Sequence, residues 1–319
     1  LIGNLSMPEN LYSPPLLFGN GHIQTIFPVL FRKINSVSYK RERIKTFDKD
    51  FIDLDWSTQD NNRLAIISHG LEGNTQRAYI KGMVKALNNN NWDALAWNYR
   101  SCSGEPNHLL KSYHNGVTDD LSWVIKHASQ KYPYKEIALI GFSLGGNLTL
   151  LYLGRENPDP IITKSVVFSV PCDLKASAKV LTKPSNKLYM KRFLVMLHQK
   201  IKQKMKIFPD LIDDKGYEKI KNFKAFDDRY TAPIHGFKNA YDYYEKCSSK
   251  PFIPDIKVPT LIINAMNDPF LSEKCYPVKE AKTNKFITLS MPDSGGHVGF
   301  VSFNKQHIYW SEKRAINFL

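Results

Sequence analysis

The sequence predicts an α/β protein built on a mostly parallel β-sheet flanked by helices. Short apolar runs alternate with helical patterns along most of the chain, which is typical of βαβ units. One of these runs passes into a helical pattern through a glycine-rich turn. The chain has 319 residues, of which 42% are hydrophobic, and this is enough for one large α/β domain or two smaller ones.

The elements follow in a regular order after residues 1–35, which form a Pro- and Gly-punctuated arm with a short helix around Gln24–Phe31. The clearest strands are Leu64–Ser68, Ala94–Asn98, Ile137–Ile140, Ser165–Val170, Thr260–Asn264 and Phe286–Ser290. The helical patterns between and after them are Ala78–Asn88, Gly116–Gln130, Asn147–Arg155 and Tyr309–Phe318.

This alternation stops between Cys172 and Lys257, where no convincing core strand appears. We therefore expect residues 1–171 and 258–319 to form the core, and residues 172–257 to form a helical cap insertion over the carboxyl ends of the strands. One apolar stripe at helical spacing runs through Met190, Phe193, Leu194, Leu197, Ile201 and Met205. The stretch Lys175–Lys206 holds ten basic residues and no acidic one. Either the stripe packs on the core and the lysines are solvated, or this basic cap also contacts an anionic membrane.

Composition limits the remaining function classes. The net charge is +14, but Lys outnumbers Arg 34 to 10, as in a general compositional bias. The basic stretch lacks the interleaved aromatic residues of a single-strand platform, so we expect no nucleic acid partner. Phosphate-loop, dinucleotide and zinc-helix motifs are missing, and we expect neither a cofactor nor a metal site.

The four cysteines are too far apart for a zinc site or a disulfide framework, which favours a reducing compartment. The first twenty residues lack a basic region that leads into an apolar core, and no stretch fits a bilayer span. We therefore expect a soluble, cytoplasmic protein.

Ser143 lies at the centre of Gly141-Phe142-Ser143-Leu144-Gly145, between a strand pattern and a helical pattern. A Gly-x-Ser-x-Gly match alone is a weak signal, but a match at such a junction is far rarer. The turn is so sharp that side chains two positions away on either side would collide with backbone, which explains Gly141 and Gly145. The serine hydroxyl would be exposed at the start of a helix, whose dipole favours negative charge. We expect Ser143 to be a nucleophile.

A serine hydroxyl needs a base, and on a sheet of this kind an acid and then a histidine follow the nucleophile, each after a late strand. Asp268 follows the run TLIIN, and His297 follows the run FITLS after two glycines. The sequence therefore predicts the catalytic set Ser143, Asp268 and His297. His297 would act as general base and then as general acid, and Asp268 would hold its tautomer.

Other acids and histidines fit this order less well. Asp173 comes one strand too early, and Asp293 lies on the strand that should carry the histidine. Seven of the nine histidines precede Asp268, and His307 opens the terminal helical pattern.

An oxyanion hole needs two backbone N–H groups that point to one position. Leu144, directly after the nucleophile, would supply one. Leu71 would supply the other, because His69-Gly70-Leu71-Glu72-Gly73 follows the strand pattern LAIIS. We expect Glu72 to be a solvated loop residue.

Seven motifs in one order give the chain a family resemblance: GHIQT at 21–25, HGLEGN at 69–74, NYRSCSGEPN at 98–107, SYHNGVTDDL at 112–121, GFSLGGN at 141–147, NDPF at 267–270 and GGHVGF at 295–300. With these motifs the chain resembles the YheT-like branch of the α/β-hydrolase superfamily, from about Pro14 to the end. The resemblance implies an α/β-hydrolase fold and hydrolysis of carboxylic esters, among them short-chain esters, acylglycerols and phospholipids. Members usually carry Gly after the arginine at position 100, where this chain has Ser101, a loop change. The motif gives no physical role to Tyr113-His114-Asn115-Gly116.

The leading hypothesis is thus a serine carboxylesterase or acylglycerol lipase that acts on a small-molecule ester or lipid through an acyl-enzyme. Amide or thioester hydrolysis would use the same residues. A second hypothesis is a ligand-binding relative that keeps the fold without turnover; its usual mark is a lost triad member, and none is lost here.

Overall fold

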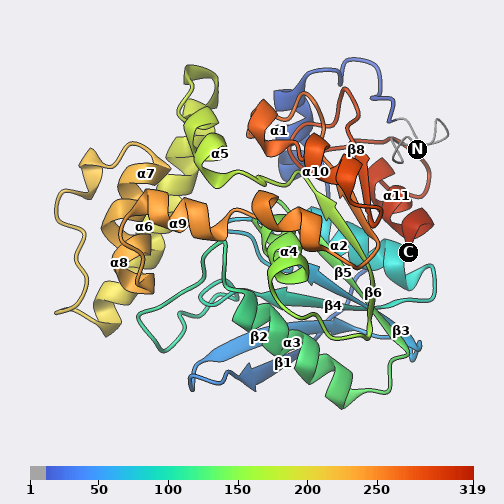
Figure 1. The fold of residues 1–319 in the computed structure, drawn as a ribbon, viewed down its shortest axis with the longest axis horizontal. Helices are drawn as coiled ribbons and strands as arrows, with labels where there is room; N and C mark the ends of the chain where they lie inside the picture. Colours follow the sequence, from blue (N-terminus) through green and yellow to red (C-terminus); the bar gives the residue numbers. More distant parts are fainter. Residues whose placement is uncertain (1–11) are drawn as a thin grey trace.

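The computed structural model describes residues 12–319 and contains an eight-stranded sheet of order β1-β2-β4-β3-β5-β6-β7-β8 (Figure 1). The strands are β1 (Lys40–Lys45), β2 (Phe51–Ser57), β3 (Arg63–Ser68), β4 (Asp93–Asn98), β5 (Glu136–Phe142), β6 (Ile162–Phe168), β7 (Thr260–Ile263) and β8 (Ile287–Ser290). β2 runs antiparallel to both β1 and β4, and all other neighbours are parallel. The predicted α/β class with a mostly parallel sheet is confirmed, and the carboxyl ends of β3 to β8 meet at one edge.

Each strand predicted from the sequence is present, with β6 beginning three residues earlier than expected. The prediction missed β1 and β2, because charged residues interrupt their apolar pattern. Asp53 and Asp55 on β2 are buried, and each accepts a two-pronged hydrogen bond from an arginine on β1, Arg43 and Arg41 respectively. The acids are therefore interior residues with partners on the neighbouring strand.

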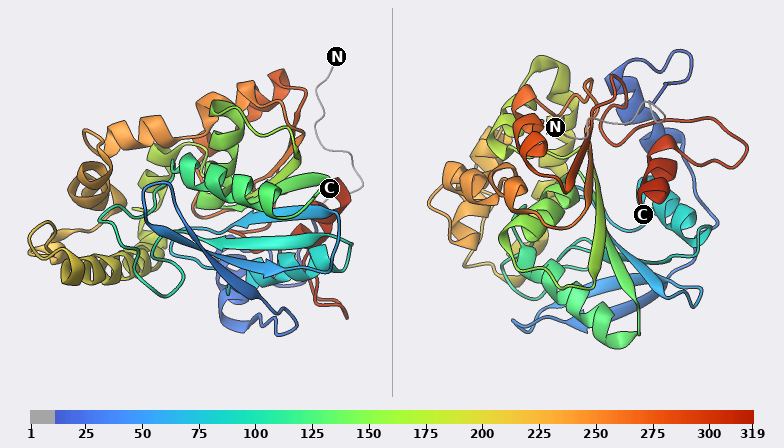
Figure 2. Two further views of the ribbon diagram at one scale, coloured as in Figure 1. Left: turned by 90° about the horizontal axis from the view of Figure 1, so that it is seen from below. Right: turned by 45° about the vertical axis from the view of Figure 1, so that its right-hand side comes forward.

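Helices cover both faces of the sheet (Figure 2). One face packs on α3 (Thr118–Lys131) and α4 (Leu144–Arg155), and the other on α2 (Ala78–Asn88) and α11 (Trp310–Phe318). The strands supply alternate residues to the two cores, because successive side chains on a strand point to opposite faces. On β3, for example, Leu64 and Ile66 enter the first core, whereas Ala65 and Ile67 enter the second. The remaining helices outside the β6–β7 connection are α1 (Gly21–Phe31) and α10 (Val278–Thr283).

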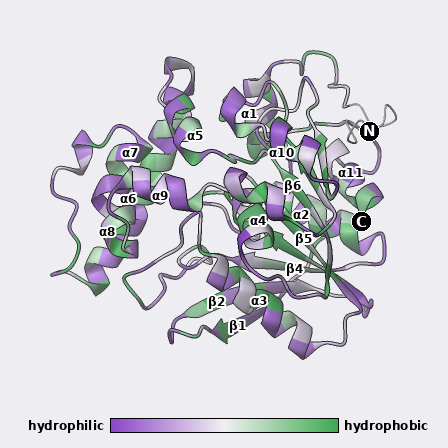
Figure 3. Cartoon of the chain, viewed as in Figure 1, coloured by the Kyte–Doolittle hydropathy of each residue, from purple (hydrophilic) through white to green (hydrophobic). Residues whose placement is uncertain are grey.

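The connection between β6 and β7 is helical and has a hydrophobic cluster of its own. It lies to one side of the sheet, in yellow and orange in Figure 1, and its helices carry both green and purple residues in Figure 3. Its helices are α5 (Leu174–Val180), α6 (Lys187–Ile207), α7 (Phe223–Phe226), α8 (Ala232–His235) and α9 (Ala240–Cys247), with a π-helical turn at Asp227–Thr231. Short 3₁₀ turns occur in it at Pro184–Asn186, Tyr217–Lys219 and Lys250–Asp255, and another follows β7 at Glu273–Cys275.

The long helix α6 carries the predicted apolar stripe on its inner side. Met190, Leu194 and Ile201 are buried in the cluster of the helical connection, and Phe193, Leu197 and Met205 pack against it. The expectation that the lysines are solvated is wrong for two of them. Lys204 is buried, and its ammonium donates to the Asn107 side chain and to the carbonyls of residues 107 and 109. Lys200 also faces inward, with 17% of its side chain exposed.

All four cysteines are buried free thiols. Between residues 12 and 319, no helix combines the length and the apolar character needed to cross a membrane.

Candidate active site

Ser143 occupies a strained turn between β5, which ends at Phe142, and α4, which begins at Leu144. Its backbone has φ 54° and ψ −115°, a conformation that side-chain-bearing residues rarely adopt. The two flanking glycines allow this turn. A Cβ on Gly141 would lie 2.5 Å from the carbonyl oxygen of Gly145, and one on Gly145 would collide with the carbonyl oxygen of Ser68. The steric reason expected for the Gly-x-Ser-x-Gly spacing is therefore present.

The structure brings Ser143, His297 and Asp268 into one hydrogen-bonded chain. His297 Nε2 lies 2.9 Å from Ser143 Oγ, and His297 Nδ1 lies 2.9 Å from Asp268 Oδ2. The Asp268 side chain is fully buried, and its carboxylate also accepts from the backbone N–H of Phe270 at 2.8 Å. A buried carboxylate beside Nδ1 keeps the proton on that nitrogen and leaves Nε2 free to accept the serine proton.

The loops that carry the acid and the histidine are held to each other and to α1. The backbone N–H of Gly296 donates to Asn267 Oδ1 at 2.9 Å. The backbone N–H of His297 donates to Thr25 Oγ1 on α1, also at 2.9 Å. The glycine-rich lead-in is needed here, because a Cβ on Gly296, at φ 59°, would lie 2.5 Å from the carbonyl oxygen of Gly21.

The other aspartates and histidines considered for the catalytic set do not join this hydrogen-bonded chain. Asp173 caps α5 by accepting from the backbone N–H of Ala176 at 2.9 Å, and Asp293 is exposed. His307 is exposed, with φ 56°. His69 is fully buried and hydrogen-bonds backbone groups of Gly70 and Tyr99. Burial lowers the pKa of His69 to about 3, so this ring is neutral.

Leu71 and Leu144 have backbone N–H groups available near Ser143. The loop that contains Leu71 passes close to the nucleophile, since a Cβ on Gly70 would lie 3.3 Å from Ser143 Cβ. The N–H groups on either side of Leu71 are occupied: Gly70 donates to Tyr79 Oη and Glu72 donates to Tyr113 Oη. Neither Leu71 nor Leu144 donates its N–H to any acceptor within residues 12–319.

Glu72 is not the solvated loop residue that the sequence suggested. Its side chain is buried, and its backbone has φ 53°. Glu72 Oε1 accepts from Tyr113 Oη at 2.6 Å and forms an ion pair with Lys200 of α6 at 3.1 Å. We call Glu72, Tyr113 and Lys200 the loop clamp, because they fix the residue next to Leu71 from two directions. Neighbouring residues in the sequence do not reveal the clamp, because its members are far apart in the chain.

The segment Tyr113-His114-Asn115-Gly116, which had no role at the level of sequence, joins three parts of the molecule. Tyr113 holds Glu72, as described above. Asn115 donates through its side chain to Tyr243 Oη of α9 at 2.7 Å. The carbonyl of Asn115 accepts from the side chain of Asn147 on α4, which also donates to the carbonyl of Cys247. The segment therefore supports the helix behind Ser143 and ties it to α9.

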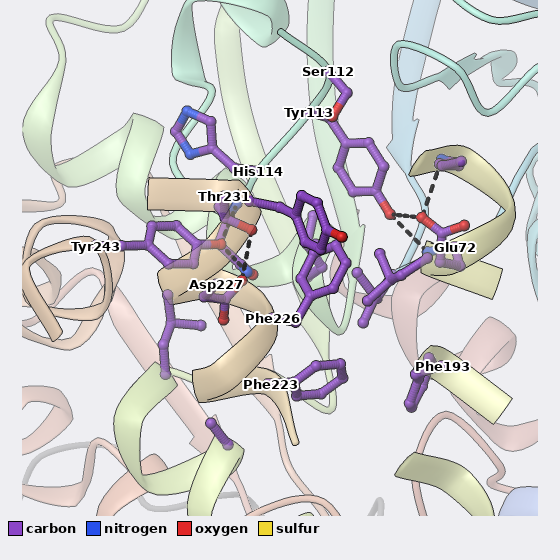
Figure 4. Close-up of a pocket in the computed structure, with 18 of the residues that line it drawn as sticks. Glu72, Ser112, Tyr113, His114, Phe193, Phe223, Phe226, Asp227, Thr231 and Tyr243 are labelled. Atoms are coloured by element: carbon purple, nitrogen blue, oxygen red, sulfur yellow. Dashed lines mark hydrogen bonds and ion pairs between the residues drawn. The ribbon is translucent and has the colours of Figure 1, made fainter. Parts of the chain in front are cut away.

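A cavity of about 150 Å³ adjoins Ser143 and His297. Figure 4 shows other residues that line it, among them Glu72, Phe226 and Asp227. The helical connection supplies much of its wall, which is mainly apolar and includes Phe193, Leu197, Phe223, Phe226 and Tyr230.

Two acidic residues line this cavity, Glu72 of the loop clamp and Asp227. Burial raises the pKa of Asp227 to about 7, although Thr231 Oγ1 and Tyr244 Oη both donate to it at 2.6 Å. Asp227 opens the π-helical turn, and sequence periodicity gave no reason to single it out.

Comparison with known protein families agrees with this geometry. A family model described as the alpha/beta hydrolase fold matches residues 66–302. The chain belongs to the α/β-hydrolase family. It is 34% identical to the Escherichia coli (strain K12) protein named "Putative esterase YheT" over 310 residues, which cover 95% of this chain and 91% of that protein. The YheT-like assignment is therefore confirmed.

Two further comparisons agree with the fold. The chain is 29% identical to the Homo sapiens protein named Phospholipase ABHD3, over 91% of this chain and 73% of that protein. The structure of the Pyrococcus furiosus esterase Pf2001 superposes with a TM-score of 0.61, at 19% identity and with 97% of each chain covered. At that identity the superposition supports the shared fold alone.

Proposed function

We propose that the protein is a serine hydrolase that cleaves carboxylic esters through the catalytic set Ser143, His297 and Asp268. The observation that carries the proposal is the hydrogen-bonded chain from Ser143 Oγ through His297 to the buried carboxylate of Asp268. The names of the relatives, an esterase and a phospholipase, support the same class of reaction.

In the first half of the reaction, His297 Nε2 takes the proton of Ser143 as Oγ attacks the carbonyl carbon of the ester. The oxygen that becomes negative accepts hydrogen bonds from the N–H groups of Leu71 and Leu144, and the amino end of α4 adds favourable dipoles. Asp268 stabilises the imidazolium. When the tetrahedral intermediate collapses, His297 gives its proton to the departing alcohol, and the acyl group stays on Ser143.

In the second half, a water molecule loses a proton to His297 and attacks the acyl-enzyme. The same two N–H groups stabilise the second oxyanion. Its collapse releases the carboxylic acid, and Ser143 regains its proton from His297.

The apolar cavity supports a substrate with an apolar acyl chain, such as an acylglycerol or a shorter ester. We propose that residues 172–257 act as a cap that limits the length of this chain, because their side chains supply much of the cavity wall. p-Nitrophenyl esters and monoacylglycerols of graded chain length test this. A rate optimum at one length is expected, and equal rates for all lengths would contradict a cap-defined pocket.

The test of the nucleophile is the substitution Ser143→Ala. We expect turnover of an activated ester to fall roughly 10⁴- to 10⁶-fold while the protein stays folded. A fluorophosphonate probe should label wild-type protein at Ser143 and fail to label the variant. Ser185→Ala, which changes an exposed serine, is the matched control and should keep wild-type turnover. If folded wild-type protein is neither active nor labelled, a ligand-binding role replaces the enzyme.

A further inference from the structure

Large hydrophobic side chains are exposed together around α1. Half of the sixteen such side chains within residues 12–319 lie on α1, on the turn before it and at one position after β8. We call these eight the α1 face, and their exposed fractions run from 41% to 90%: Leu16, Leu17, Ile23, Ile26, Val29, Leu30, Phe31 and Phe303. A water-exposed surface rarely gathers so many in one place.

The polarity of α1 is reversed relative to that of an ordinary surface helix. Its buried residues are Gly21, Gln24, Thr25 and Pro28, whereas its aliphatic residues and Phe31 face outward. The buried polar side chains have partners: Gln24 accepts from Tyr12 Oη and from the N–H of Val301, and Thr25 accepts from the N–H of His297. The inner side of α1 thus packs against the loop that carries His297. The apolar side has no core to pack against.

Aromatic contacts join α1 to the loop before it and to the stretch after β8. The ring of Phe27 lies 4.9 Å from that of Phe18, 5.0 Å from that of Phe31 and 5.8 Å from that of Phe303. Phe18 belongs to the loop directly before α1. In that loop Leu17 has φ 71° and is 83% exposed, so a strained backbone presents an apolar side chain to the outside.

The exposed charged residues that neighbour the α1 face along the chain are lysines. Exposed Lys33 follows Phe31 by two residues, and exposed Lys305 follows Phe303 by two. The stretches 12–39 and 294–311, which contain the whole face, hold no acidic residue. Apolar side chains bordered by lysines, on a protein of net charge +14, are typical of a surface that enters the boundary of an anionic bilayer.

We propose that the α1 face docks the protein on the surface of a bilayer that contains anionic phospholipid. Leu16, Leu17 and the outward residues of α1 enter the boundary between head groups and acyl chains, while Lys33 and Lys305 contact phosphates. This differs from contact through the basic side of α6, because the apolar residues of α6 mostly face inward.

The docked face is close to the proposed catalytic residues. His22 of α1 stacks on Tyr189 with ring centres 5.7 Å apart, Tyr189 contacts Phe270 at 4.8 Å, and Phe270 contacts His297 at 4.2 Å. Delivery of a lipid ester from the bilayer to Ser143 rests on the proposed function, whereas the docking itself does not.

Co-sedimentation with vesicles tests the docking, with phosphatidylcholine alone and with equal parts of phosphatidylcholine and phosphatidylglycerol. We expect wild-type protein to bind the mixed vesicles more strongly. Leu16→Asp/Leu30→Asp should weaken this binding roughly 100-fold, because two large apolar side chains no longer enter the bilayer and two negative charges repel it. Phe47→Asp/Leu211→Asp is the matched control, since it makes the same charge change at exposed hydrophobic residues elsewhere and should leave most of the binding.

Three results would overturn the proposal. The first is wild-type protein that fails to bind mixed vesicles. The second is equal loss in the two double variants, or loss only in Lys191→Glu/Lys206→Glu, which would locate binding on α6. The third is a wild-type protein that is dimeric and does not bind vesicles, and that becomes monomeric in the Leu16→Asp/Leu30→Asp variant. A second copy of the chain would then be the partner of the α1 face.

Thermal unfolding of each variant confirms that it is folded. The Ser143→Ala variant should bind vesicles like wild type, and wild-type hydrolysis of a water-soluble ester is measured without vesicles. The docking and the ester hydrolysis can therefore fail independently.

Discussion

The ion pair between Glu72 and Lys200 gives a quantitative test of the loop clamp. Lys200 comes from α6, and Glu72 is next to Leu71. Burial alone would lower the pKa of Lys200, but its contacts with Cys102 and Glu72 raise that pKa above its ordinary value. Burial raises the pKa of the Cys102 thiol to about 11, so Cys102 is neutral near pH 7. Glu72 is then the carboxylate that balances Lys200.

Glu72→Gln and Lys200→Met should each lower the free energy of unfolding. The double variant should lower it by less than the sum of the two single effects. Glu72→Gln leaves a buried ammonium beside a neutral thiol, and Lys200→Met leaves a buried carboxylate with the Tyr113 hydroxyl as donor. Removing one partner of such a pair costs about 3 kcal/mol of unfolding free energy. The double variant Glu72→Gln/Lys200→Met leaves no unpaired charge, and we expect it to cost less than either single variant, below about 3 kcal/mol, so that the coupling exceeds about 3 kcal/mol.

Urea unfolding followed by tryptophan fluorescence measures all four proteins. The matched control is the pair on α9 between exposed Lys246 and half-buried Asp242, where Lys246→Met and Asp242→Asn should couple by less than about 0.5 kcal/mol. Additive costs at Glu72 and Lys200 would refute the reasoning. Turnover is the second readout: Glu72→Gln should lower kcat about 10- to 100-fold with KM nearly unchanged, because Leu71 loses its fixed position. Equal changes in kcat and KM would contradict a positioning role.

Three more predictions concern single residues. Asp268→Asn should lower kcat about 10⁴-fold on an activated ester because the histidine tautomer is no longer held, whereas Asp293→Asn, at an exposed aspartate, should leave kcat unchanged. Gly145→Ala should lower the unfolding free energy measured in urea by about 1–3 kcal/mol and should lower turnover, because the new Cβ would collide with the Ser68 carbonyl. A variant as stable as wild type would contradict the close packing described for the turn at Ser143. Asp227 has a pKa raised from 3.8 to about 7 by burial, so the folded state binds more protons than the unfolded state between these values, and wild-type stability should fall as pH rises through that window. Asp227→Asn should remove this fall, so the melting temperature of the variant relative to wild type should rise from about pH 5 to about pH 8; parallel profiles would show that Asp227 does not titrate there.

The sequence was sufficient to predict the parallel part of the sheet and the three residues that meet at its edge. The parallel strands are short apolar runs, and in a parallel sheet their carboxyl ends must lie together. Ser143, Asp268 and His297 each follow such a run, so their meeting did not depend on the helical connection. The loop that contains Leu71, which we propose as part of an oxyanion hole, was located in the same way, from its position after β3.

The predictions that failed concern residues whose polarity and burial disagree. Periodicity assigns each residue to a face by its own polarity, yet Asp53 and Asp55 are interior residues because arginines on β1 reach them. Glu72 was assigned to solvent for the same reason, and its partner Lys200 lies in a helix that was assigned a solvated basic side. In each case the residue that decides burial is distant in the chain, so local pattern could not supply it.

The residues whose burial disagrees with their polarity are concentrated in the parts of the molecule that the proposals concern. Burying a charge or exposing a large apolar side chain costs free energy, so such residues persist only where a partner or a function compensates. Glu72 and Lys200 join the helical connection to the loop of Leu71, and Asp227 is an acid in the wall of an apolar cavity. The α1 face is the opposite case, because its polar residues are buried against the histidine loop and its apolar residues have no partner within residues 12–319 that covers them. A bilayer would supply that partner, and the vesicle measurements decide whether it does.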